Sequence, residues 1–80
     1  MTPKDINNLC WYAARYAMGR MTYAVADVTE AIDRNRADLS PATRDGICAD
    51  IDRAAQRGEL GMAQDVERWL ALRATLTPKP

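Results

Sequence analysis

The sequence contains no histidine, the side chain that most often serves as a general base or a metal ligand near neutral pH. It also has no glycine-rich phosphate loop and no pairing of a nucleophile with a base. Its two cysteines, Cys10 and Cys48, are too far apart in sequence to form a metal-binding pair. We therefore predict a protein that is not an enzyme and that uses no metal or cofactor, with both thiols buried and reduced.

Glycine and proline are scarce, with four of each, and they fall mostly at the apparent boundaries of structural elements. No apolar run is long enough to span a membrane, and no signal or transit peptide is recognisable. A length of 80 residues allows one compact domain with a thin core. We expect residues 1–80 to form a single domain that works in a cytoplasm and contacts no membrane, with 77–80 as a frayed tail.

An excess of charge of either sign is also absent, because eleven acidic residues balance eleven basic ones. A general nucleic-acid-binding protein would be basic overall, so this class is disfavoured. The balance is uneven along the chain: residues 25–52 hold seven carboxylates against three arginines, and both flanking segments are mildly basic. The middle of the chain is therefore an acidic zone.

Four segments repeat apolar residues at steps of three and four, the pattern of amphipathic helices. Each is bounded by residues that favour helix ends, such as threonine, serine or proline at the start and glycine at the end. The predicted helices begin at about Thr2, Thr22, Ser40 and Gly61 and end at about Gly19, Leu39, Arg57 and Leu76. Short connections between them predict an all-α fold, a compact bundle of about four short helices.

The periodicity also predicts which residues face the core. The first helix would bury an apolar stripe of Ile6, Leu9, Cys10, Ala13, Ala14 and Ala17. The last would bury Met62, Val66, Trp69, Leu70, Arg73 and Leu76, with Leu72 at the edge. Gly46 stands inside the third helix at a cost of about 1 kcal/mol relative to alanine. We interpret this glycine as a place where another helix crosses closely.

One candidate surface lies on the first helix. Steps of four residues connect Trp11 with Arg15, and Tyr12 with Tyr16 and Arg20. Aromatic side chains beside arginine are used by proteins that bind single-stranded nucleic acids, through stacking and phosphate contacts. The alternative is that the rings are edges of the core and the arginines lie over them.

The acidic zone is the second candidate surface. Its carboxylates on the second and third helices would form one negative face for a basic partner. The alternative is that these residues are ordinary solvated helix surface. The residues predicted to bind a partner are Asp27, Glu30, Asp33, Asp38, Asp45 and Asp52.

Residues 11–28, WYAARYAMGRMTYAVADV, resemble a group of very short phage and prophage proteins. The shared features are an aromatic-rich helix, the Arg15-Tyr16 pair, the Gly19-Arg20 turn and the Thr22-Tyr23 start of a second helix. The similarity continues more loosely through Gly58-Glu59-Leu60-Gly61-Met62 to the helix that carries Trp69.

Among small phage proteins, the chain is similar to anti-CRISPR proteins directed at type I systems, with type I-C favoured. This resemblance implies a non-catalytic inhibitor in the cytoplasm of a bacterial host cell. It would bind the Cascade surveillance complex of a CRISPR-Cas system and block target DNA binding, as a monomer or a weak homo-oligomer. The alternative is a small phage regulatory or nucleic-acid-binding protein that uses the surface of Arg15, Tyr16 and Arg20.

Overall fold

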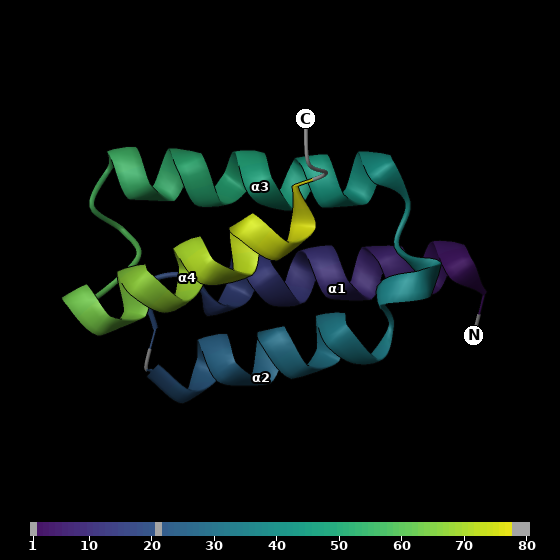
Figure 1. Ribbon diagram of the computed structural model, residues 1–80, viewed down its shortest axis with the longest axis horizontal. Helices are drawn as coiled ribbons and strands as arrows, with labels where there is room; N and C mark the ends of the chain where they lie inside the picture. The colour runs from purple at the N-terminus through teal and green to yellow at the C-terminus, as the bar shows by residue number, and fades with distance from the viewer. Residues whose placement is uncertain (1, 21, 78–80) are drawn as a thin grey trace.

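The computed structural model describes residues 2–20 and 22–77, without the side chains of Thr22 and Tyr23. It confirms the predicted all-α bundle. Its elements are the helices α1 (Pro3–Ala17), α2 (Thr22–Arg34), α3 (Pro41–Gln56) and α4 (Ala63–Leu76), and a short 3₁₀ helix η1 (Arg36–Asp38) (Figure 1). The predicted capping by Thr22 and the tail residues 78–80 lie outside the described part.

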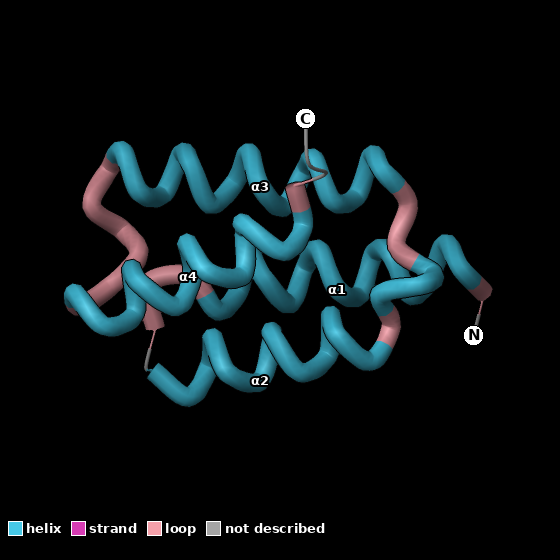
Figure 2. Tube along the Cα trace, in the orientation of Figure 1, coloured by secondary structure: helices cyan, strands magenta, loops and turns pink. Residues whose placement is uncertain are grey.

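The four helices form a flattened ring that measures 34 × 28 × 17 Å along its principal axes. Helices α2 and α3 occupy opposite edges, and α4 lies in front of α1 between them (Figure 1). Both α1 and α4 pack against α2 and against α3. Short loops connect successive helices, so neighbours in sequence run in opposite directions (Figure 2).

Local capping signals set the starts of two helices, as predicted. The Thr2 hydroxyl accepts a hydrogen bond from the Asp5 amide at 3.2 Å, and the Asp5 carboxylate accepts one from the Thr2 amide at 3.2 Å. Ser40 caps α3 by accepting from the Thr43 amide at 3.2 Å. Each cap satisfies amides that have no partner within their own helix.

The prediction that the second helix extends through Leu39 is wrong, because α2 ends at Arg34. The Asn35 side chain donates to the Ala31 carbonyl at 2.9 Å, and η1 follows as a tighter turn. Pro41 also disfavours a helical conformation for the residue before it, so the chain extends before α3 begins. Leu39 is still buried, at 5% exposure, but from an extended segment.

The core is a single cluster to which every α-helix contributes. Both Cys10 and Cys48 belong to it as buried free thiols. Its largest fully buried side chain is Trp69 of α4. The other members are Ala14, Ala17, Val25, Val28, Ile32, Leu39, Ile47, Ile51, Ala54, Leu60, Leu72 and Leu76.

The predicted inner face of the last helix is partly wrong. Leu70 is 45% exposed and Met62 71% exposed, whereas Leu72 is buried. Helix α4 packs against both α2 and α3, and these two contacts turn the line from Trp69 through Leu72 to Leu76 inward. The helix also begins at Ala63, not at Gly61, and Leu9 of α1 is exposed rather than buried.

Gly46 lies at a close crossing of α1 and α3, as predicted. A Cβ atom at this position would lie 2.1–2.7 Å from three ring atoms of Trp11. Real Cβ atoms do not approach other atoms so closely. The missing side chain of Gly46 therefore makes room for the Trp11 indole against α3.

Candidate functional site

The predicted acidic residues are divided between two edges of the bundle. Asp27, Glu30 and Asp33 lie on α2, and Asp45 and Asp52 lie on α3, the opposite edge (Figure 1). The expected single negative face across both helices is therefore not formed, because α1 and α4 separate the two groups. Sequence spacing places residues around one helix but does not say which helices will be neighbours.

Several of these carboxylates are engaged by arginines. Asp52 accepts from Arg73 Nε at 2.6 Å and from Arg73 Nη2 at 2.8 Å, and this hydrogen-bonded guanidinium lowers the pKa of the Asp52 carboxyl. Glu30 pairs with Arg34, and Asp33 pairs with Arg36. Of the six residues predicted to bind a partner, Asp27, Asp38 and Asp45 are exposed and make no such pair within residues 2–20 and 22–77.

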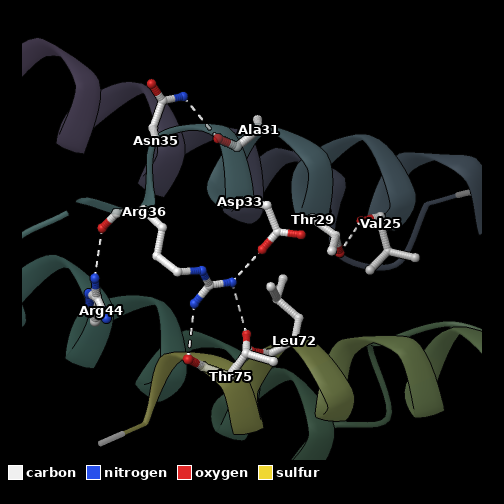
Figure 3. Close-up of polar contacts among 9 residues, drawn as sticks. All are labelled: Val25, Thr29, Ala31, Asp33, Asn35, Arg36, Arg44, Leu72 and Thr75. Atoms are coloured by element: carbon white, nitrogen blue, oxygen red, sulfur yellow. Dashed lines mark hydrogen bonds and ion pairs between the residues drawn. The ribbon is translucent and has the colours of Figure 1, made fainter. Parts of the chain in front are cut away.

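A groove of about 520 Å³ runs between α2 and α4, beside the acidic residues of α2. Ala26, Ala71 and Leu72 supply apolar lining, while Glu30 and Asp33 line the α2 side. Figure 3 shows Thr29 and Asp33 of α2 facing Leu72 and Thr75 of α4 at one end of this groove. Arg68 lines the α4 side, so the groove combines apolar surface with two carboxylates of α2 and one arginine of α4.

Arg36 fixes the geometry at that end of the groove (Figure 3). Its guanidinium donates to Asp33 of α2 at 2.5 Å and to the carbonyl and hydroxyl oxygens of Thr75 at 3.0 and 3.2 Å. Its own carbonyl accepts from Arg44 of α3 at 2.7 Å. Sequence spacing does not reveal this role, because the partners of Arg36 on α4 and α3 lie 39 and 8 positions away in the chain.

The aromatic surface of α1 is divided by the structure into two parts. Tyr12 and Tyr16 are 64% and 71% exposed, and the Arg20 guanidinium stacks over the Tyr16 ring at 4.3 Å from its centroid. Trp11, by contrast, is partly buried against the core, and Arg15 lies over its ring at 4.9 Å. The interpretation as a core edge therefore holds for Trp11 and Arg15, whereas Tyr12 and Tyr16 form an exposed surface with Arg20.

Asp50 of α3 connects the inner part of this surface to the core. The buried carboxylate accepts hydrogen bonds from Trp11 Nε1 at 2.7 Å, Arg15 Nε at 2.7 Å and Arg53 Nη1 at 2.9 Å. Burial by itself would raise the pKa of Asp50, but these donors and the charge of Arg15 outweigh it and hold the pKa below its usual value. The residue counted in sequence as part of an acidic zone is therefore an internal anchor for α1.

No group of three potential metal ligands lies together among the described residues. No described helix has the length and hydropathy required to cross a membrane. A scan against protein-family models finds no match, and searches of curated proteins and of solved structures find none either. The function must therefore be argued from the surfaces themselves and from the resemblance in sequence.

Proposed function

We propose that this chain is a non-catalytic inhibitor that binds a type I Cascade complex, type I-C in particular, and prevents target DNA binding. The resemblance of residues 11–28 to short phage proteins suggests the partner. The observation that carries the proposal on the structural side is the groove between α2 and α4, with its apolar lining and its carboxylates on α2.

The chemistry of this groove fits a protein partner better than a nucleic acid. Negative charge repels a phosphate backbone but attracts a basic protein surface, and complementary charge accelerates association. A complex that captures DNA must present lysine and arginine to the phosphates. An acidic helix docked on such a surface would compete directly with DNA, and the apolar lining would hold a side chain of the partner.

The direct test is to mix the purified protein with type I-C Cascade and to measure target DNA binding by gel shift, with co-elution on size exclusion as the second readout. We expect a stable complex and a loss of DNA binding that saturates at a stoichiometric ratio. Unchanged DNA binding together with the absence of co-elution would refute the proposal.

A pair of charge-reversal variants assigns the contact to one edge of the bundle. Asp27→Lys with Glu30→Lys changes the α2 surface, and Asp38→Lys with Asp45→Lys makes the same change in charge near the start of α3. All four side chains are exposed, so both variants should fold. We expect the α2 variant to lose inhibition at least tenfold and the control to retain it. The reverse result would move the contact to the other edge.

Nucleic-acid binding is the second candidate, favoured by the exposed rings of Tyr12 and Tyr16 with Arg20 stacked beside them. In that case the protein alone would retard single-stranded DNA or RNA, and affinity would fall steeply with salt. Replacing Tyr16 and Arg20 by serine and glutamate would abolish retardation, whereas Asp27→Lys would strengthen it. No retardation at low salt would remove this candidate.

A further inference from the structure

A cleft of about 580 Å³ opens at the end of the bundle where α1 and α3 both finish. Three arginines line it: Arg15 from α1, Arg53 from α3 and Arg57 just after α3. The carboxylates of Asp50 and Glu59 also line it, so the three arginines leave the side chains of the cleft with a net charge of +1. It lies apart from the groove between α2 and α4, with which it shares no lining residue.

The buried Asp50 carboxylate holds two of the three guanidinium groups in place. It binds Nε of Arg15 and Nη1 of Arg53, which is one nitrogen from each group. The other two nitrogens of each guanidinium also carry N–H donors. None of these donors is used within residues 2–20 and 22–77, and about half of each side chain remains accessible, 51% for Arg15 and 56% for Arg53.

Arg57 brings a third guanidinium to the cleft. In the described part of the chain its side chain makes neither a hydrogen bond nor an ion pair. Gly58 and Gly61, with φ of +68° and +101°, turn the chain sharply beside it. The cleft thus presents unused N–H donors from three guanidinium groups. Asp50 already holds two of these groups in place, and this reduces the entropy lost when an anion binds.

We propose that this cleft binds the phosphate group of a phosphate monoester. Arginine matches the oxygens of phosphate with pairs of N–H donors, and a tetrahedral dianion offers enough oxygens for guanidinium groups that approach from two helices. A planar carboxylate has only two oxygens and a single charge. The volume exceeds that of a free phosphate ion, and Met18 and Ala54 supply an apolar wall for the group that the phosphate esterifies.

The test is an NMR titration of the full chain with inorganic phosphate at pH 7.5, with chloride at matched ionic strength as the reference. We expect saturable shifts of the Nε–H signals of Arg15 and Arg53, with an affinity on the order of millimolar. Arg57→Gln should weaken binding about tenfold, the scale of one charge-assisted hydrogen bond. Arg68→Gln removes the same charge from exposed α4 outside the cleft and should leave the affinity unchanged.

A second arm distinguishes free phosphate from a phosphate ester. A nucleoside 5′-monophosphate that binds more tightly than inorganic phosphate, while the nucleoside alone does not bind, supports an ester as the ligand. Equal affinity for inorganic phosphate and for the ester would mean that the site recognises only the phosphate ion. That result would overturn the assignment to an ester. Shifts as large with chloride or acetate as with phosphate, or equal losses in Arg57→Gln and Arg68→Gln, would overturn the site itself.

Discussion

At Gly46, the absence of a side chain lets the Trp11 ring lie directly against α3. The indole cannot move aside freely, because its N–H is bonded to the buried carboxylate of Asp50 at 2.7 Å. A residue with low helix propensity is therefore retained in the middle of a helix for a reason of packing. The cost in helix propensity is confined to α3, and the packing that Gly46 allows joins α1 to α3.

We predict that Gly46→Ala destabilises the protein by about 2 kcal/mol, because overpacking outweighs the gain in helix propensity of about 1 kcal/mol. Urea unfolding followed by circular dichroism measures the change. In a Trp11→Leu background the same substitution should become neutral or stabilising. Ala49→Gly, on the exposed side of α3, isolates the propensity effect. An equal loss in both backgrounds would contradict the assigned clash.

Asp50→Asn should lower the free energy of unfolding by about 2 kcal/mol at pH 7, because charge-assisted hydrogen bonds to a buried carboxylate are lost. The native pKa of Asp50 is depressed, so its contribution is present above the unfolded pKa of about 3.9 and is lost as the pH falls through the lower, native pKa. The difference between the two proteins should therefore shrink progressively below about pH 4.

Unfolding in urea from pH 7 to pH 2 checks this dependence. Asp45→Asn, at an exposed carboxylate on the same helix, serves as the control and should leave the free energy of unfolding at pH 7 nearly unchanged. A difference between wild type and Asp50→Asn that stays constant down to pH 2 would show that the ionised form of Asp50 is not the stabilising one.

At the scale of the elements, one side chain of α1 holds the segment between α2 and α3 in position. The Asn7 amide nitrogen donates to the Asp38 carbonyl at 2.9 Å and to the Pro3 carbonyl at 2.6 Å. Its oxygen accepts from the Ser40 amide at 2.8 Å. Asn7 thereby satisfies the backbone on both sides of Leu39, the point at which that apolar side chain enters the core.

Asn7→Ala should cost about 1–2 kcal/mol of stability and should increase hydrogen exchange at the Ser40 amide, because that donor loses its acceptor. Native-state hydrogen exchange by NMR gives the local effect. Asn8→Ala is the matched control, since Asn8 is the exposed neighbour on the same helix. Unchanged protection of the Ser40 amide would mean that the hydrogen bonds of Asn7 are not needed to hold η1.

The helices differ in how well their ends and inner faces could be predicted from the sequence. The starts of α1 and α3 were predictable because Thr2 and Ser40 act on amides within three residues of themselves. The end of α2 and the inner face of α4 were mispredicted. They depend on the Asn35 side chain and on contacts with two other helices, which periodicity along one helix does not contain.

For the candidate surfaces too, local features could be predicted from the sequence and contacts between helices could not. The exposure of Tyr12 and Tyr16 was predictable from spacing on one helix, whereas Arg20 stacks on Tyr16 from the turn that follows α1. The grouping of Arg15 with Asp50 joins residues 35 positions apart, and the pairing of Asp52 with Arg73 joins residues 21 positions apart. These long-range pairs engage Asp50 and Asp52 in addition to the local pairs of Glu30 and Asp33, so the acidic zone in sequence did not become one acidic surface.

On the scale of the whole molecule, all four helices share one hydrophobic cluster. Among the described residues no helix has a separate core, and each helix contacts two others in the ring. A small domain of this kind unfolds in one cooperative step, with a total stability of about 4–12 kcal/mol for its length. Removing one large central side chain therefore threatens the entire fold, not only one helix.

Trp69 is the side chain to test, since it is the largest fully buried one. We predict that Trp69→Ala costs about 3–5 kcal/mol, enough to leave much of the protein unfolded at 37 °C, whereas Trp69→Phe remains folded with a smaller loss. Thermal unfolding followed by far-ultraviolet and near-ultraviolet circular dichroism should give coincident transitions in the wild type. Separate transitions would indicate that part of the bundle folds independently.

The hydrogen bond between Trp11 and Asp50 has a practical consequence. Indole emission responds to the charges around the ring, and the Trp11 ring touches both Asp50 and Arg15, two groups at the arginine-lined cleft. In a Trp69→Phe background, Trp11 becomes the only tryptophan of the chain, and excitation at 295 nm selects it over the tyrosines. Binding of any molecule that draws Arg15 away from Asp50 should then change the Trp11 emission, so binding can be measured without an attached dye.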